Sequence, residues 1–345
     1  MVMQKVIEIL KKIQKKGIIT AIKYLIYIFE NREKYKSYGE KNSDKIFYVI
    51  RSINEKSKFY TGVNLNLLAN YSYVISHIMY AKKKGWIPVV DQLNYPVYNK
   101  EDRLINGTNN PWEYFWRQPN GTTLKEVYES KNVILSKRSW YQPGNPEYSI
   151  EKHTDKKYIQ MYNKLMSDVP LNSYTKCHCD NMYNKLFKGR KKIVGVSMRN
   201  AGYSANSIFQ ASGHPIQPTI EQLIKIVDNV IKQYSADTIF LATEENANVE
   251  KFKEIFGDSL IVYPRRRYNG WRKFTDSDPN PLYCSGKKYQ TCLDYLTEME
   301  LLARCNILIG SITSGLRYAI YRNNLKYEKL IVLNYGKFSY SRNIF

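Results

Sequence analysis

The stretch Ile307-Leu-Ile-Gly-Ser-Ile-Thr-Ser-Gly315 decides the fold expected for this 345-residue chain. Its first five residues form a short apolar run, which predicts a buried strand, and the pattern at 314–322 predicts a helix. Small hydroxyl side chains and a glycine lie where the strand gives way to the helix. Because free backbone N–H groups at a helix start attract anions, we expect residues 311–315 to form a phosphate-binding turn.

The same alternation of apolar runs and helical patterns continues on both sides of this stretch. We predict strands and helices, in chain order, at 192–198, 219–233, 238–243, 247–256, 260–263, 291–304, 307–311, 314–322 and 329–333. Helices that alternate with apolar strands in this way predict a parallel, doubly wound sheet. Residues 189–345 are therefore expected to form a Rossmann-like domain.

The first half of the chain repeats the pattern with fewer elements. We predict a strand at 45–50, a helix at 67–84 and a second strand at 86–91. Such a βαβ unit implies parallel strands. It places the loop with Gly62 and Asn64 at the carboxyl edge of the sheet, where ligands bind in open α/β folds.

Residues 94–148 are rich in Pro, Gly, Asn and aromatic side chains, which predicts irregular segments between short elements. The tryptophans of this region either pack as local cores or stack on a ligand, and the composition leaves both interpretations open. Helical patterns at 155–166 and 179–188 follow, and we expect a domain boundary near residue 188. The predicted fold is α/β, with two Rossmann-like domains at 41–188 and 189–345 that face a cleft, after a leader at 1–40.

The composition is that of a folded protein. Apolar residues make up 43% of the chain and charged residues 24%, which argues against disordered and fibrous classes. Five cysteines form an odd set spread through a long chain, so we expect a reducing compartment rather than a disulfide framework. The N-terminus lacks the order of a signal peptide, and we therefore expect a cytoplasmic protein.

The formal net charge of +22 is large. Such a charge attracts nucleic acid, anionic membrane surfaces or phosphorylated ligands. The chain contains no RNA-binding motif and its basic residues are dispersed, so we expect no nucleic-acid partner. Nucleic-acid binding is kept as an alternative function.

The N-terminal leader combines apolar and basic residues. Its longest apolar stretch, at 17–29, is too short to span a membrane. Apolar residues nevertheless recur at helical spacing, at Val6, Leu10, Ile13, Ile18, Ile22, Leu25 and Phe29, among several lysines. Two interpretations remain open: an amphipathic helix that packs on its own domain, or one that lies on an anionic membrane surface.

Residues that directly follow the predicted strands of the C-terminal half are the expected ligand contacts. They are Arg199 and Asn200, then Thr243, Glu244 and Glu245, then Arg265, Arg266 and Arg267, and finally Ser311, Thr313 and Ser314. Arg199 either binds phosphate or forms an ion pair with one of the two glutamates. The three adjacent arginines form either a solvated basic patch or part of a nucleotide site.

We expect no metal site and no bound cofactor. The pair Asp276 and Asp278 has the Asp-x-Asp form of some metal sites, but a turn is the better interpretation in such a polar loop. The run Cys177-His-Cys179 is too compact for a structural zinc site. The chain also lacks a Walker loop and a Gly-x-Gly-x-x-Gly fingerprint, which argues against ATPases and dinucleotide enzymes.

Several motifs of the C-terminal half together resemble the fucosyltransferase superfamily, which includes α-1,6-fucosyltransferases, nodulation fucosyltransferases and protein O-fucosyltransferases. Residues 194–200 resemble its Gly-Val-His-Val-Arg-Arg strand end, and His214-Pro-Ile216 is similar to its His-Pro-Ile. Residues 239–245 are similar to its Leu-Ala-Thr-Asp-Asp. Residues 298–303 and 309–314 resemble its acidic helix and its Ser-rich loop.

The resemblance implies a GT-B-like architecture and a GDP-sugar donor. It implies that Arg199 holds the donor β-phosphate and that Glu298 contacts the base or ribose. The remaining donor-binding residues that we expect are Asn200, Thr243, Ser311, Thr313, Ser314 and Arg317. Gly62 and Asn64 would belong to the acceptor-side loop.

Sugar transfer with inversion needs a general base for the acceptor hydroxyl. Residues 201–213 contain no carboxylate, although some relatives place their base there. The candidates that we name are Asp91, His214 and Glu244, with Glu113 as a weaker one.

The sequence hypothesis is a cytoplasmic, metal-independent glycosyltransferase that acts on a polysaccharide or a lipid-linked glycan, with the leader at the inner face of the plasma membrane. A glycan-binding domain of the same fold that lacks catalysis is a further alternative.

Overall fold

The computed structural model describes residues 18–53, 66–138, 150–199, 209–210, 214–269, 286–339 and 342–343. Contacts divide the chain into two compact units. Unit 1 comprises Met1–Asn66, Asn70–Tyr98 and Gln118–Asn145. Unit 2 comprises Leu67–Ala69, Asn99–Arg117 and Pro146–Phe345.

Unit 1 is built on a four-stranded sheet in the order β1-β4-β2-β3. Its strands are β1 (Lys34–Lys36), β2 (Phe47–Arg51), β3 (Ile87–Asp91) and β4 (Val133–Leu135). Strand β2 runs parallel to β3 and to β4, and β1 is antiparallel to β4. The helix α3 (Leu67–Lys83) connects β2 to β3, so the predicted βαβ unit is confirmed.

The shorter elements of unit 1 differ from the prediction. Strand β4 lies in the region where we expected irregular segments between short elements, but neither it nor β1 was located from the sequence. Both have only three residues, too few for a periodic pattern to appear. The unit also contains the helix α2 (Ile18–Glu30), the 3-10 turn η1 (Pro119–Gly121) and the short helix α4 (Leu124–Val127).

Unit 2 contains a five-stranded sheet in the order β10-β9-β5-β7-β8, and every neighbouring pair in it is parallel. Its strands are β5 (Ile193–Met198), β7 (Thr238–Thr243), β8 (Leu260–Val262), β9 (Ile307–Ser311) and β10 (Lys329–Leu333). A separate pair, β6 (Phe209–Gln210) and β11 (Arg342–Asn343), is antiparallel. The predicted parallel α/β sheet is confirmed.

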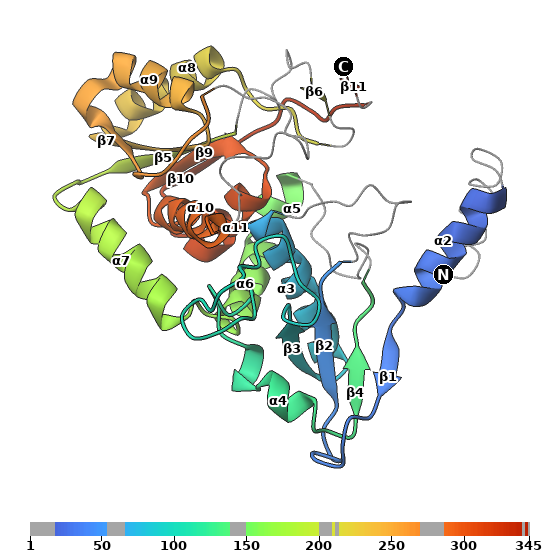
Figure 1. Cartoon of the computed structure of the whole chain (residues 1–345). Helices are drawn as coiled ribbons and strands as arrows, with labels where there is room; N and C mark the ends of the chain where they lie inside the picture. The colour runs from blue at the N-terminus through green and yellow to red at the C-terminus, as the bar shows by residue number, and fades with distance from the viewer. Residues whose placement is uncertain are drawn as a thin grey trace. The chain divides into compact units, whose positions relative to one another are not determined.

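Helices cover both faces of this sheet (Figure 1). The helices α8 (Ile220–Tyr234) and α9 (Asn246–Phe256) lie on one face, where Leu223, Val227 and Phe252 are buried with the strands. The helices α10 (Lys288–Leu302) and α11 (Ser314–Asn323) lie on the other. Eleven residues of α10 are buried, which explains why its sequence shows weak amphipathic periodicity.

Three further helices belong to unit 2: α5 (Ile150–Thr154), α6 (Lys156–Ser167) and α7 (Ser173–Phe187). The Tyr162 ring of α6 stacks on Tyr321 of α11 with centroids 4.7 Å apart, and the Asn163 side chain donates to the Tyr321 carbonyl at 2.8 Å. The expected boundary near residue 188 therefore falls inside unit 2. Helix α7 begins before the predicted residue 179 because the Asn172 side chain caps it, accepting from the Thr175 N–H at 2.8 Å.

Residues 99–117 also group with unit 2. Glu101 accepts hydrogen bonds from the backbone N–H groups of Gly286 and Tyr289, at 3.0 and 2.8 Å. The rings of Trp112 and Trp116 are buried with centroids 4.7 Å apart. Of the two interpretations of these tryptophans, the local core is confirmed. No helix among the described residues is long and apolar enough to cross a membrane.

Candidate functional site

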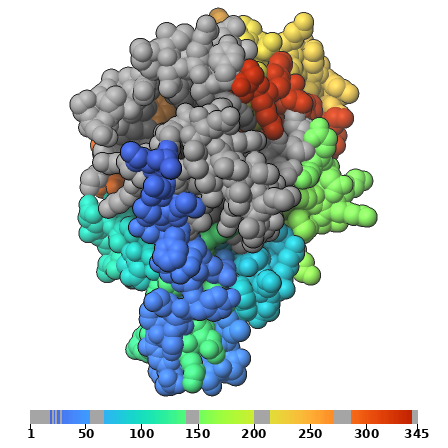
Figure 2. Space-filling model, turned by 90° about the vertical axis from the view of Figure 1, so that its right-hand side faces the viewer, coloured from blue at the N-terminus to red at the C-terminus, as the bar shows by residue number. Residues whose placement is uncertain are grey.

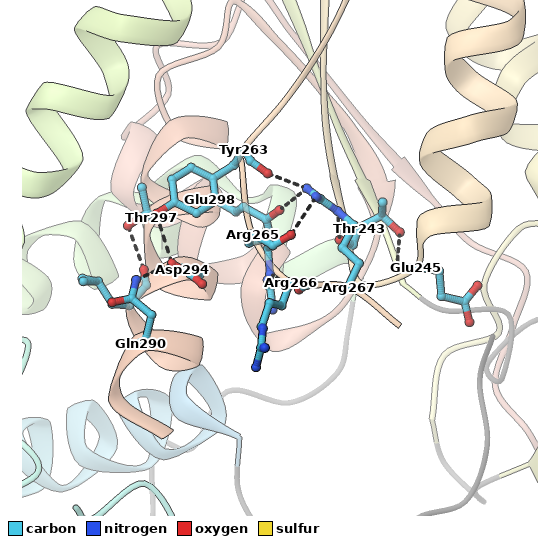
Figure 3. Close-up of polar contacts among 11 residues, drawn as sticks. Thr243, Glu245, Tyr263, Arg265, Arg266, Arg267, Gln290, Asp294, Thr297 and Glu298 are labelled. Atoms are coloured by element: carbon cyan, nitrogen blue, oxygen red, sulfur yellow. Dashed lines mark hydrogen bonds and ion pairs between the residues drawn. The ribbon is translucent and has the colours of Figure 1, made fainter. Parts of the chain in front are cut away.

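Polar residues of unit 2 collect where its parallel strands end. Arg199 follows β5, Thr243 ends β7, and Ser311 ends β9. Tyr263 follows β8 and leads into the three adjacent arginines (Figure 3). Ligands of open parallel sheets bind at this carboxyl edge.

Glu298 on α10 forms two buried ion pairs. The Arg265 guanidinium lies 2.7 Å from one carboxylate oxygen, and that of Arg267 lies 3.3 Å from the other. The three side chains are between 2% and 6% exposed. Burial raises the pKa of Glu298, and the two guanidinium groups act in the opposite direction. The carboxylate that we expected to contact a base or ribose therefore pairs with two arginines in this structure.

Arg267 also joins the ends of two strands. It donates to the Tyr263 carbonyl at 2.7 Å and to the Thr243 carbonyl at 3.2 Å. Arg266 is exposed, whereas the side chains of its two neighbours are buried. Arg265 and Arg267 thus form, with Glu298, a buried hydrogen-bonded frame at the carboxyl edge of the sheet. Of the three arginines, only Arg266 is a solvated residue.

A chain of polar side chains extends from this frame toward α7. The Tyr263 hydroxyl donates to Asp294 at 3.1 Å and lies 3.0 Å from the ring nitrogen Nε2 of His178. Gln290 donates to the same Asp294 oxygen at 2.7 Å. Burial lowers the pKa of His178, so the ring is neutral near pH 7.

The expected phosphate-binding turn lies at the start of α11. The Thr313 side chain caps the helix by accepting from the Leu316 N–H at 3.0 Å. Ser311 is 1% exposed, and its hydroxyl has no hydrogen-bond partner in the part of the chain that the structure describes. A buried hydroxyl without a partner is costly.

Tyr295 on α10 lies against this turn. Its hydroxyl forms a hydrogen bond with Ser314, and a Cβ atom added at Gly315 would lie 2.6 Å from the same hydroxyl. Burial raises the pKa of Tyr295 to about 12, with Glu244 acting in the same direction and Arg199 against it. The Tyr295 hydroxyl thus contacts Ser314 and feels the charges of Arg199 and Glu244.

Two of the three proposed bases lie in this region. Burial lowers the pKa of His214, and the charge of Arg199 acts in the same direction. Glu244 is half-buried at the end of β7, and its carbonyl accepts from the Tyr268 N–H at 2.8 Å. The charge of Arg199 therefore lowers the pKa of one proposed base, His214. The charge of the other, Glu244, raises the pKa of Tyr295.

Asp91 lies in unit 1 and is fully buried at the end of β3. One of its carboxylate oxygens accepts from the backbone N–H groups of Leu93 and Asn94, at 3.1 and 2.9 Å. The other accepts from the Asn94 side chain and from the Tyr128 hydroxyl. These contacts hold the turn after β3, so the geometry gives Asp91 a structural role. Glu113 is similarly engaged by Thr108 and Asn110.

Arg317 lies on α11 and is 2% exposed. Its charge acts on the hydroxyls of Tyr162 and Tyr321. Thr243 is also buried, and its hydroxyl accepts from the Asn248 side chain at 3.0 Å.

Some predicted residues fall outside the described part of the chain: Gly62, Asn64, Asn200, Asp276 and Asp278. Within the described part, no group of three or more His, Cys, Asp or Glu residues could hold a metal ion.

The sequence analysis missed Tyr263, Asp294 and Tyr295. Asp294 and Glu298 are four residues apart, which places both on one face of α10. The predicted strand at 260–263 included Tyr263, so this residue was not among those selected after strand ends; β8 itself ends at Val262. For Tyr295 the sequence offers no signal, because its contact with Ser314 depends on how α10 and α11 pack.

No protein-family model matches the sequence, and no curated protein matches it. Solved structures do. The chain is 14% identical to the fucosyltransferase NodZ from Bradyrhizobium, over 86% of this chain and 98% of that one, with a TM-score of 0.44.

A variant of FUT1 from Arabidopsis thaliana in complex with GDP is 11% identical, over 95% of this chain and 78% of that one, with a TM-score of 0.43. POFUT1 in complex with GDP is 8% identical, over 84% and 98%, with a TM-score of 0.44.

Proposed function

We propose that the chain is a glycosyltransferase that takes a fucose-like sugar from a GDP-sugar or a related nucleotide-diphosphate donor. The observation that carries this proposal is the hydrogen bond between Tyr295 and Ser314 at the start of α11, at the carboxyl edge of a parallel sheet where Arg199 also follows the end of β5. A permanent cation, hydroxyl donors and a helix N-terminus together suit a diphosphate. The buried Ser311 hydroxyl adds a further donor.

The reaction that fits this site is a direct, inverting displacement without a metal. The acceptor oxygen forms a bond to the anomeric carbon while the bond between that carbon and the diphosphate oxygen breaks. Arg199 and the N–H groups of α11 stabilise the negative charge that develops on the diphosphate. The acceptor proton goes to a base. His214 suits this role because its lowered pKa keeps the ring neutral near pH 7, and Glu244 is the second candidate.

For the acceptor we propose a surface polysaccharide or a lipid-linked glycan. Transfer would then take place in the cytoplasm, at the inner face of the plasma membrane. The amphipathic, basic N-terminal leader supports that location.

Binding of GDP, UDP, CDP and ADP, measured by thermal shift, tests the donor site. A nucleotide that binds only the folded chain raises its stability by ~2.7 kcal/mol at a concentration of about 100 times Kd. We expect GDP to give the largest shift, because the motifs resemble those of enzymes that use GDP-fucose. Arg199→Ala should weaken GDP binding by roughly tenfold to a hundredfold, the range of a charge-assisted hydrogen bond.

Arg190→Ala is the matched control, since Arg190 is exposed in the turn before β5. Its affinity for GDP should equal that of the unchanged protein. The proposal fails if none of the four nucleotides raises the melting temperature and no nucleotide sugar is consumed. GDP binding without transfer to any glycan would instead leave a glycan- or nucleotide-binding protein that lacks catalysis.

A further inference from the structure

The helix α2 exposes an unusual amount of apolar surface. Six of its thirteen residues are large apolar side chains that are between 45% and 66% exposed: Ile18, Ile19, Ile22, Leu25, Ile26 and Phe29. Figure 2 views the molecule from the side on which α2, in dark blue, lies at the surface. An apolar helix face inside a domain core would be almost fully buried. Of the two interpretations of the leader, packing on its own domain therefore does not apply to this face.

These side chains form one stripe. Ile18, Ile22, Leu25 and Phe29 follow one another at intervals of four, three and four residues. Such intervals return to the same side of a helix. Ile19 and Ile26 widen the stripe on one flank. A continuous exposed stripe of this kind marks a binding surface rather than the scattered apolar residues of an ordinary surface.

Basic and aromatic residues border the stripe where α2 ends. The Arg32 guanidinium lies 3.9 Å from the centre of the Phe29 ring. In β1, which follows directly, Tyr35 is 71% exposed and Lys36 is also exposed. Tyrosine and arginine side chains are common at the boundary between lipid headgroups and acyl chains, where one end is apolar and the other polar.

The sequence before α2 adds positive charge. Residues 1–17 contain five lysines and one glutamate. We infer that α2 lies in the plane of an anionic phospholipid surface, with its apolar stripe among the acyl chains. The lysine-rich sequence that precedes it adds the positive charge that such a surface attracts. A helix with an apolar face and flanking lysines binds membranes in this way.

The net charge of the chain favours an anionic membrane over a second copy of the chain as the partner of α2. Two copies, each with a net charge of +22, would bring two lysine-rich leaders together if their α2 stripes paired. Like charges oppose such a contact, whereas anionic headgroups attract it. This inference does not depend on the proposed transfer reaction.

Cosedimentation with vesicles tests it, with phosphatidylcholine alone and with phosphatidylcholine mixed with phosphatidylglycerol. We expect the full chain to bind the mixed vesicles, and to bind them more weakly as salt is raised. The double variant I22E/L25E should lose roughly tenfold or more of this binding, because two charged groups would enter the apolar region. Replacing Lys11, Lys12, Lys15 and Lys16 by Gln should remove the preference for phosphatidylglycerol.

Leu104→Glu is the matched control. Leu104 is 63% exposed and belongs to unit 2, so its variant should bind vesicles like the unchanged protein. Equal vesicle binding by I22E/L25E and the unchanged protein would overturn the inference. The inference would also be overturned if the unchanged protein did not bind the mixed vesicles. A dimer in solution that the I22E/L25E substitutions dissociate would overturn it as well. The GDP-induced thermal shift of I22E/L25E separates the two proposals, because it should be unchanged.

Discussion

At the scale of single residues, Glu298 is the side chain of unit 2 whose loss we expect to reduce the free energy of unfolding most. It compensates the charges of Arg265 and Arg267, and all three side chains are almost fully buried. Removing one partner of a buried ion pair leaves charge in a poorly solvated place and costs ~3–5 kcal/mol. We therefore expect Glu298→Gln to lower the free energy of unfolding by about this amount, measured by urea denaturation.

Glu254→Gln is the comparison for this measurement. Glu254 pairs with Lys251 at 2.8 Å, but both side chains are exposed, by 66% and 45%. Exposed pairs of this kind contribute only ~0–1 kcal/mol. If both variants lose the same stability, the buried frame around Glu298 has no special energetic role.

His77 gives unit 1 a dependence on pH. It is fully buried, and its Nδ1 lies 2.9 Å from the Tyr48 hydroxyl. Burial lowers the pKa of His77 from 6.5 to about 3, and Lys137 and Arg51 act in the same direction. Between these two pH values the unfolded chain binds a proton that the folded chain does not. The free energy of unfolding therefore falls as the pH is lowered from 6.5 toward 3.

The slope from this one group reaches ~1.4 kcal/mol per pH unit. We expect His77→Gln to flatten the fall in stability below pH 6.5, measured by urea denaturation at neutral pH and at about two units lower. Tyr48→Phe should keep the slope, because it removes a hydrogen bond but not the titrating ring. An unchanged slope in His77→Gln would show that other groups carry the acid sensitivity.

At the scale of elements, the start of α11 depends on close contact with α10. A Cβ atom at Gly315 would lie 2.6 Å from the Tyr295 hydroxyl and 2.7 Å from the Met299 sulfur. The sulfur belongs to a flexible, unbranched side chain, whereas the hydroxyl is held by Ser314. Gly315→Ala should therefore displace Tyr295 and weaken GDP binding as well as stability.

A double-mutant cycle tests this contact. In the Tyr295→Phe background the added Cβ atom no longer meets the hydroxyl, and the next ring atom lies 3.4 Å away. We expect Gly315→Ala to cost less there than in the unchanged protein, with a coupling of ~0.5–3 kcal/mol. Additive costs, measured by urea denaturation of the four proteins, would contradict the close approach of the two helices.

The elements also show how far the sequence leads. The strands β7, β9 and β10 and the helix α3 begin or end as predicted because each is a continuous apolar or periodic run. The turn at the start of α11 was predictable for a similar reason, since its strand, hydroxyls and glycine are consecutive. The ion pair of Arg265 with Glu298 joins residues 33 positions apart. No local pattern contains that information, so it depends on the packing of α10 under the sheet.

At the scale of the whole molecule, unit 2 is discontinuous in the sequence. It combines Leu67–Ala69, Asn99–Arg117 and Pro146–Phe345, and unit 1 contributes the chain between these segments. The expected boundary near residue 188 follows the alternation of strands and helices. That alternation cannot reveal that α6 packs on α11 and α7 on α10, because helix periodicity shows that a face is buried but not against which partner.

The buried side chains of α6 and α7 decide how the chain can be divided. Ile159, Tyr162, Met166, Cys179 and Phe187 are at most 5% exposed. A fragment of residues 189–345 loses all of them and leaves apolar surface of α10 and α11 uncovered. Each large side chain buried in this way stabilises a fold by about 1.5–3 kcal/mol, so the loss approaches the whole stability of a domain. We expect this fragment to show no cooperative unfolding transition in circular dichroism.

A fragment of residues 99–345 retains the two larger segments of unit 2 and lacks only Leu67–Ala69. We expect it to unfold cooperatively and to keep the GDP-induced thermal shift, because Arg199, Tyr295, Ser311 and Ser314 all lie within it. Cooperative unfolding of the 189–345 fragment, together with GDP binding, would instead restore the boundary near residue 188. The two fragments thus decide what the proposed donor site needs. It depends either on the second sheet and its helices alone or also on the earlier segments 99–117 and 146–188.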